Sequence, residues 1–393
     1  MLQRVKFSVG WLIVSAILFA ALMVHRGGGH DYIQFHAAAE LLSSSNTPYG
    51  HAEQWQAQRD LREGVDLREL EPNDLYSAIG ILPYFYPPWV ALAVIPLTMF
   101  RYAVAKAIWI YLCAQALILA GFLSSPSGRR YPTLTVGFAI AFMPAFSAVE
   151  IGQVAPFVLL FVVVSARLLE KESDVAAGFV LAWFTIKPQL SVIALPATLI
   201  WAARRGRWKV VTRFAFTLAT LAIISAEFLP DWPLRMIAAP RQFPLPTSID
   251  PSVGVTWLTF CQTLGFNGMT LACVYALAAI PATALALHAA WDQNTSIKET
   301  LGRGVLAAFF VAPYALGYDL AMLVFPFFVV NSRLTGRASV WLFGVGMLVP
   351  YWTLWAVQSG VPQVAFFWMP VALALLWVSL DYRNRRRLIP PAV

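Results

Sequence analysis

The chain has 393 residues, of which 59% are hydrophobic and only 12% are charged. Because a soluble globular domain carries roughly 25% charged residues, a chain with half that share cannot cover its surface in water, and an integral membrane protein is favoured. The net charge of +8 could indicate nucleic-acid binding, but the basic residues cluster in short loops between apolar runs, as on the cytoplasmic side of membrane proteins.

The N-terminus resembles a signal peptide, since Arg4 and Lys6 precede an apolar run. No small-x-small cleavage site closes that run, so we expect an uncleaved first transmembrane helix near residues 7–24. The polar segment 25–83 follows, and in it nine acidic residues outnumber four arginines. This balance suits the outer side of the membrane, so the segment is predicted to be the first periplasmic loop.

Residues 84–100 are apolar, but they are short for a span and begin with aromatic residues and adjacent prolines. Such residues belong at headgroup level. If this stretch crossed the membrane, the Arg129-Arg130 loop and later basic loops would lie outside, against the positive-inside rule. We therefore predict an interfacial helix over 84–100 rather than a span.

Apolar runs near 20 residues fit the ~30 Å hydrocarbon thickness, and they predict an all-α polytopic membrane protein with about twelve spans and both termini cytoplasmic. The expected spans lie near residues 7–24, 101–123, 133–149, 154–168, 175–187, 189–203, 210–229, 269–290, 304–317, 319–330, 338–357 and 363–380. Residues 230–268 form a second long periplasmic loop, and 383–393 form a basic cytoplasmic tail. All belong to a single domain, 1–393.

Two pairs of the expected spans are unusually short. One pair is hinged at Lys187-Pro188, and the other at Tyr318-Asp319. A helix of about 13 residues reaches only ~20 Å at 1.5 Å per residue. Such helices must end inside the protein, so we expect a water-filled cavity that opens to the outer side.

Ionisable groups at membrane depth are costly and each needs a reason. Asp31 follows a run of glycines and precedes an expected amphipathic helix, so it is either a helix cap or a catalytic base. Lys187 precedes a proline that breaks the helix, so it either snorkels to the headgroups or binds a phosphate. Asp319 is either a cap or a cavity carboxylate.

The other candidates are weaker. Gln153 and Gln189 are inexpensive polar groups, and Arg241 is either a surface residue or a phosphate clamp. The Tyr86-Pro87-Pro88-Trp89 corner is either a rigid interfacial turn or a platform for a sugar or an isoprenoid chain. The stretch Arg101 to Lys106 is expected to be a solvated helix start. No His-x-Glu or Cys-x-x-Cys metal spacing and no phosphate-binding loop occur.

A series of short motifs carries a resemblance to a known family. The motifs are Asp31-Tyr-Ile-Gln-Phe-His-Ala-Ala-Ala with Pro48-Tyr49, Phe85-Tyr-Pro-Pro-Trp with Pro96-Leu97, Gly152-Gln153, Ile186-Lys-Pro-Gln-Leu190 with Arg204 to Trp208, and Tyr318-Asp319-Leu320. In this order over residues 7–330, they resemble the GT-C superfamily, specifically glycosyltransferase family 87, which includes mycobacterial mannosyltransferases. Two departures bear on the identity of the acceptor and of the donor: His36 replaces a usual tyrosine, and Tyr318-Asp319 stands where mycobacterial members carry a histidine.

The resemblance implies a GT-C-like fold and an inverting transfer of a sugar, mannose in the relatives, from a polyprenyl-phosphate donor. The acceptor would be a lipid or glycan at the periplasmic side of a bacterial inner membrane. Asp31 would be the general base. Lys187, Gln189, Gln153 and Arg241 would bind the donor, and Tyr32, His36, Tyr86, Tyr318 and Asp319 would line the substrate cavity. No cofactor is required, because polyprenyl phosphate is already a good leaving group, although some GT-C families use a divalent metal.

Two other functions fit parts of the sequence. A transporter or flippase of a lipid-linked precursor would share the cavity, but it should show polar groups through the full membrane depth and ideally an internal repeat, and we find neither. A scaffold subunit that kept the fold but lost activity would be compatible with the departures at His36 and Tyr318.

Overall fold

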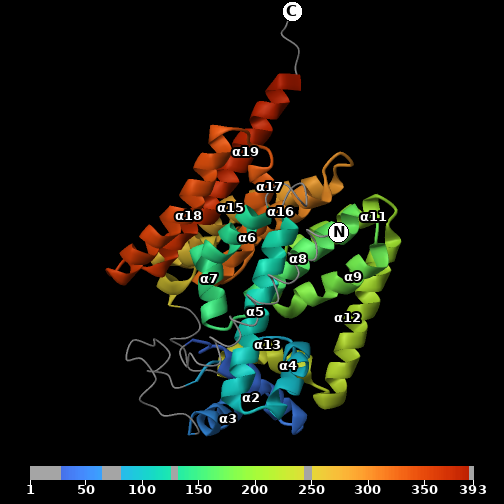
Figure 1. Cartoon of the computed structure of the whole chain (residues 1–393), viewed down its shortest axis with the longest axis vertical. Coiled ribbons are helices and arrows are strands. Elements are labelled where there is room, and N and C mark those ends of the chain that lie inside the picture. The colour runs from blue at the N-terminus through green and yellow to red at the C-terminus, as the bar shows by residue number, and fades with distance from the viewer. Residues whose placement is uncertain (1–27, 64–80, 125–131, 243–249, 389–393) are drawn as a thin grey trace, which may run out of the picture. The chain divides into compact units, whose positions relative to one another are not determined.

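The computed structural model describes residues 28–63, 81–124, 132–242 and 250–388 (Figure 1). The described residues form helices joined by turns and loops and contain no strand, apart from an isolated bridge between Gly254 and Leu316. The all-α prediction is therefore confirmed for this part of the chain. The expected first span, 7–24, lies outside the described residues.

The chain divides into two compact units, and each is described by itself. The first unit comprises Met1–Ala116, Ala148–Val154 and Ala219–Pro244, and the second comprises Leu117–Ser147, Ala155–Leu218 and Leu245–Val393. The single domain expected from the sequence, with its loop boundaries, stays a prediction.

Helix α2 (Tyr32–Ser43) forms the core of the first unit. It packs against α3 (His51–Glu63), α4 (Pro88–Val94) and the 3-10 helix η2 (Ile95–Met99), and Figure 1 shows α2, α3 and α4 grouped. We expected an amphipathic helix here, but residues 32–39 are all buried. The consecutive alanines 37–39 explain the difference, because small side chains let neighbouring helices approach on every side.

Residues 84–100 form two short helices instead of one long one. Pro87 adopts an extended conformation (φ −59°, ψ 151°) before α4 begins at Pro88, and α4 runs directly into η2. The two helices together are too short to pass as a span. They pack against α2, and Trp89 meets Trp232 of α13 (Trp232–Gln242) edge to face, with ring centroids 5.4 Å apart.

Helix α16 (Ile297–Val311) is the centre of the second unit. It packs against α11 (Ala194–Arg204), α15 (Gly268–Trp291) and α17 (Val324–Asn331) and is buried along most of its length. Gly304 allows the closest approach, because a Cβ there would lie only 2.5 Å from Cα of Ala194. The other helices of this unit are α6 (Pro132–Ala141), α8 (Ala155–Glu170), α9 (Asp174–Trp183), α10 (Pro188–Ser191), α14 (Trp257–Thr263), α18 (Arg337–Gln358) and α19 (Trp368–Leu388).

Helices α5 (Tyr102–Ser124), α7 (Met143–Glu150) and α12 (Trp208–Phe228) have residues in both units. Five helices among the described residues are long and apolar enough to cross a membrane, or six if a pair bent by 67° counts as one span. They are Tyr102–Ser124, Trp208–Phe228, Gly268–Trp291, Arg337–Gln358 and Gln363–Arg383, with the pair Thr133–Ala141 and Met143–Glu150. Because only 11% of the apolar windows of α15 and α18 is buried within the protein, their remaining surface suits lipid, and the chain is a multi-pass membrane protein. The count of about twelve spans stays a prediction.

The helix breaks were predicted with unequal success. Lys187 is non-helical (φ −130°, ψ 80°) between the 3-10 helix η3 (Phe184–Ile186) and α10, as its proline predicted. The second hinge was misplaced: α16 ends at Val311, and the 3-10 helix η5 (Gly317–Leu323) already contains Tyr318 and Asp319. The break therefore covers residues 312–316. Its one proline is Pro313, five residues before the predicted hinge at Tyr318.

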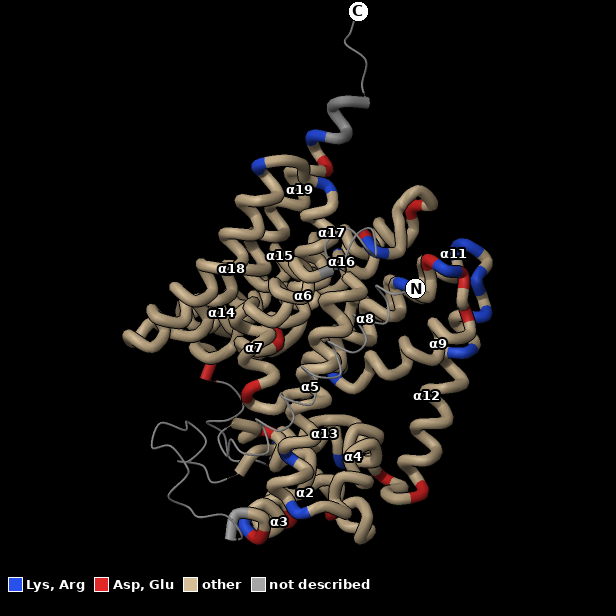
Figure 2. Tube along the Cα trace, viewed as in Figure 1, with Lys and Arg blue, Asp and Glu red and all other residues tan. Residues whose placement is uncertain are grey.

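Basic residues gather at the turn between α11 and α12 (Figure 2). Arg205 donates hydrogen bonds to the carbonyls of Asp292, Gln293 and Thr295 at 2.8–2.9 Å. Arg207 bonds to Asp174 and to the carbonyl of Leu169. The arginines of this turn therefore also fix it to neighbouring segments by hydrogen bonds.

Candidate active site

A glycine turn positions the start of α2. Gly28 and Gly29 have φ of +81° and +73°, which L-residues with a Cβ rarely adopt. The N–H of Gly29 donates to the carbonyl of Glu150 at 2.6 Å, and that of Asp31 donates to the carbonyl of Ile151 at 2.9 Å. A Cβ on Gly28 would meet the Glu150 oxygen at 2.8 Å. The turn thus lies backbone against backbone on the segment that precedes Gln153.

Gly152 turns the chain at the end of α7. Its φ is +77°, as is common for a glycine that follows a helix C-terminus. The indole Nε1 of Trp109 donates to its carbonyl at 2.7 Å, and the N–H of Gln153 donates to Ala148 at 2.8 Å. These bonds fix the direction in which the Gln153 side chain leaves the backbone.

Asp31 and Gln153 meet in the first unit. Asp31 occupies the N-cap position of α2, as expected, but its side chain makes no capping hydrogen bond. Oδ2 instead accepts from Nε2 of Gln153. Asp31 is 5% exposed and Gln153 is 1% exposed. The position of the Asp31 side chain is therefore set by a tertiary contact and not by a capping hydrogen bond.

Tyr86 orients the Gln153 amide. Its hydroxyl donates to Oε1 of Gln153 at 2.9 Å, so the amide oxygen faces Tyr86 and the amide nitrogen faces Asp31. Tyr49 in turn donates to the carbonyl of Tyr86 at 2.8 Å. The hydroxyl of Tyr84 donates to the carbonyl of Pro87 at 2.9 Å and accepts from Ala91 N–H at 3.0 Å. The Tyr-Pro-Pro corner therefore supports the Asp31 site.

Tyr32 and His36 form a second polar chain beside Asp31. The Tyr32 hydroxyl lies 3.1 Å from Nδ1 of His36, and Nε2 of His36 lies 3.3 Å from Glu40 Oε1. Burial raises the pKa of Tyr32, so its phenol stays protonated.

Stacked aromatic rings enclose this chain. The Tyr32 ring centroid lies 5.5 Å from that of Trp109 and 5.9 Å from that of Tyr102. Phe35 packs 4.9 Å from Tyr86. These rings surround the polar groups with apolar surface, where hydrogen bonds are less exposed to competition from water.

Lys187 and Asp319 meet in the second unit. The ammonium bonds to Oδ1 of Asp319, and both residues are almost fully buried. Nζ also lies 4.6 Å from the centroid of the Tyr318 ring, within the range of a cation–π contact. Asp319 Oδ2 accepts from Leu316 N–H at 3.0 Å. Asp319 therefore accepts a capping hydrogen bond at the start of η5 and also pairs with Lys187.

The remaining candidates stand apart from these contacts. Gln189 is half-buried in α10, and Arg241 is exposed in the last turn of α13. Glu150 is exposed and contributes its backbone carbonyl rather than its side chain to the glycine turn. Among the residues that the structure describes, no group of three His, Cys, Asp or Glu side chains could hold a metal ion.

Sequence reasoning missed the part played by α5. We expected a solvated start for this helix, but Lys106 is half-buried and its side chain runs beside the glycine turn, with Cδ 2.9 Å from where a Gly29 Cβ would lie. Trp109 sits one turn later and bonds to Gly152. A lysine and a tryptophan three residues apart on a long apolar helix were the available signal, because residues at this spacing share a face.

Comparison with known proteins gives one match. The sequence model of glycosyltransferase family 87 matches residues 84–316. No curated protein and no solved structure matches the chain. The matched segment contains Tyr86, Gln153 and Lys187, whereas Asp31 precedes it and Asp319 follows it.

Proposed function

Because this chain belongs to glycosyltransferase family 87, we propose that it transfers a sugar, mannose, from a polyprenyl-phosphate donor to a lipid or glycan acceptor. The family makes the chain a glycosyltransferase, and its apolar helices make it a membrane protein. A polyprenyl-linked donor suits that setting, since its chain partitions into the bilayer while its sugar phosphate stays at the surface. The same family membership favours transfer over the flippase alternative.

The proposed reaction uses Asp31 as the general base. The acceptor hydroxyl attacks the anomeric carbon, its proton passes to the Asp31 carboxylate, and the bond from the anomeric carbon to the phosphate oxygen breaks. Polyprenyl phosphate leaves, and the configuration at the anomeric carbon inverts. The observation that carries this role is the Asp31 carboxylate, which makes no capping hydrogen bond at the N-cap position and instead accepts from Gln153. A base must be held in place at hydrogen-bond reach of its proton.

The sequence suggested that Gln153 binds the donor and that Tyr86 lines the cavity. In this proposal both are instead positioning residues, because the Tyr86 hydroxyl orients the amide that holds Asp31. Tyr32 and His36 contact the acceptor. Lys187 binds the donor phosphate as a point charge, with Asp319 and Tyr318 holding the ammonium. Gln189 and Arg241 complete the donor contacts.

The topology is part of the same proposal. The chain crosses a bacterial inner membrane about twelve times, with cytoplasmic termini, a periplasmic working face and an interfacial segment 84–100. Basic loops on one side of the spans support this orientation. An accessibility reporter at residue 127 should read cytoplasmic. A periplasmic reading would instead make 84–100 a span.

Transfer is tested with the purified chain in liposomes. Labelled polyprenyl-phosphate mannose and an extract of envelope lipids should give a glycosidic product with wild-type protein and none with Asp31→Asn. A deletion strain should lose one glycolipid or glycan, restored by the wild type alone. Movement of the lipid across the bilayer without any glycosidic product would instead identify a flippase, and an unchanged envelope profile would identify a non-catalytic subunit.

A further inference from the structure

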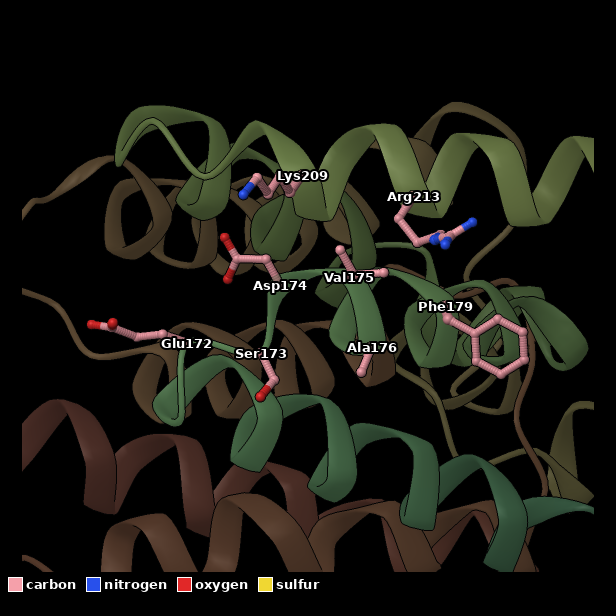
Figure 3. A pocket seen from close by; sticks show the side chains of 8 residues that line it. All are labelled: Glu172, Ser173, Asp174, Val175, Ala176, Phe179, Lys209 and Arg213. Atoms are coloured by element: carbon pink, nitrogen blue, oxygen red, sulfur yellow. The ribbon is translucent and has the colours of Figure 1, made fainter.

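A pocket of about 790 Å³ lies where α9 and α12 begin, within the second unit (Figure 3). Its rim on α12 carries Lys209 and Arg213, and its wall on α9 carries Val175 and Phe179. Each pair is separated by four residues, so each occupies one face of its helix. The α12 wall of the pocket is therefore cationic, whereas the α9 wall is apolar at Val175 and Phe179 and carries Asp174 at its start.

Close helix packing shapes the pocket. A Cβ on Gly178 of α9 would lie 2.5 Å from the carbonyl oxygen of Val210 in α12, so the glycine lets the two backbones touch. Beside this contact, Val175 is 47% exposed and Phe179 is 50% exposed. The apolar wall is thus an open groove in a membrane protein rather than part of its core.

The two cations on α12 do not stabilise the start of that helix. Lys209 and Arg213 lie in the first two turns of α12, where a positive charge opposes the helix dipole. Asp174 lines the pocket but is bonded to Arg207, whose Nε lies 2.9 Å from its carboxylate. Glu172, the other acidic lining residue, sits at the end of the pocket opposite Arg213 in Figure 3.

The start of α9 also lies at the pocket, between the acidic residues Glu172 and Asp174. Ser173 occupies the N-cap of α9 and lines the pocket, yet it makes no side-chain capping hydrogen bond. A helix N-terminus carries a partial positive charge. Arg213 lies 5.5 Å from the centroid of the exposed Phe216 ring, so its guanidinium stays next to apolar surface instead of extending into water.

We propose that this pocket binds an anionic phospholipid of the surrounding bilayer. Lys209 and Arg213 contact the phosphate, and one acyl chain lies along Val175 and Phe179. The basic turn before α12 favours the cytoplasmic side for this pocket, where the leaflet surface is negatively charged. That side is opposite to the face proposed for sugar transfer, so the occupant is a bilayer lipid rather than the polyprenyl-phosphate donor.

The test is native mass spectrometry of the full-length protein with added phosphatidylglycerol, phosphatidylcholine or polyprenyl phosphate. The double variant Lys209→Gln/Arg213→Gln should bind phosphatidylglycerol on the order of tenfold more weakly, since each basic residue near an anionic lipid contributes measurably. Phe179→Ala should weaken all phospholipids by a smaller factor, because it shortens only the apolar wall.

The matched control is Lys171→Gln/Arg204→Gln, which removes two exposed cations of the same region that do not line the pocket. It should leave phosphatidylglycerol binding unchanged. An equal loss in both double variants would show only general attraction to a basic surface and would overturn the site. So would unchanged binding in the pocket variant, or a loss confined to polyprenyl phosphate.

Discussion

Among the residues that the structure describes, the buried charges of the two units are held in different ways. In the first unit, the carboxylate of Asp31 is held by the neutral amide of Gln153, which Tyr86 orients. In the second unit, the ammonium of Lys187 is held by the opposite charge of Asp319. An amide can hold a carboxylate in place without neutralising it, whereas an ion pair fixes both protonation states together.

This difference assigns different work to the two clusters. A carboxylate that accepts a hydrogen bond from an amide still has lone pairs that can take up a proton. A buried ion pair is costly to break, because removal of either partner leaves an uncompensated charge. We therefore expect chemistry at Asp31, and structural support with donor binding at Lys187.

The largest effect should come from Asp31→Asn. It keeps the size of the side chain but removes the proton acceptor, so kcat for sugar transfer should fall by about 10² to 10⁴. Thermal unfolding in detergent should change little. Asp231→Asn, at an exposed residue paired with Arg235, is the control and should keep full activity. A wild-type rate in Asp31→Asn would show that another residue is the base.

Lys187→Ala should act on stability first. It leaves Asp319 buried without its cation, at a cost of about 3–5 kcal/mol. The double variant Lys187→Met/Asp319→Leu should recover much of that loss, because no buried charge remains. Unfolding measured by a thiol-reactive dye, at two detergent concentrations, would check this. If the double variant is as unstable as the single one, the pair is not the source of the stability.

The same double variant separates structure from donor binding. If Lys187 binds the donor phosphate, the stable double variant Lys187→Met/Asp319→Leu should show a raised KM for the donor. Recovery of stability together with a wild-type KM would leave Lys187 with a structural part alone.

Gln153→Ala should affect rate more than folding. It removes the amide that holds Asp31, and misplacement of a catalytic group by about 1 Å can cost about 10²-fold in rate. Steady-state kinetics should show a lower kcat with little change in KM. Gln189→Ala, in the second unit, should show the reverse pattern. If both variants changed kcat and KM in the same way, the two clusters would not have separate roles in catalysis and donor binding.

Tyr86→Phe should give the smallest effect. It removes one hydroxyl that donates to Gln153, and a hydrogen bond of this kind contributes about 1 kcal/mol, or roughly fivefold in rate. Tyr49→Phe serves as a control, because the Tyr49 hydroxyl donates to the backbone carbonyl of Tyr86 and leaves the bond from Tyr86 to Gln153 in place. A loss as large as that of Asp31→Asn would mean that Tyr86 itself touches the substrate.

Much of the helix pattern could be predicted because it is local. The expected spans 101–123, 269–290 and 338–357 match α5, α15 and α18 to within a few residues. Gly28 and Gly29 predicted a tight turn, and both have positive φ. The burial of α2 was not predicted, since a run of alanines is compatible with an exposed or an enclosed helix.

The partners of the buried charges were beyond the sequence. Gln153 lies 122 residues from Asp31, and Asp319 lies 132 residues from Lys187. A sequence shows that a buried charge needs a partner, but tertiary packing decides which group supplies it. For the same reason, the sequence does not show that Gln153 is oriented by Tyr86 and by the glycine turn.

The most direct measurement is a single turnover with donor already bound at saturation. Asp31→Asn should form product at least about 10²-fold more slowly than the wild type, while Lys187→Met/Asp319→Leu should form it at nearly the wild-type rate. A fast turnover in Asp31→Asn, with a slow one in the double variant, would contradict the account and move the chemistry to the second unit.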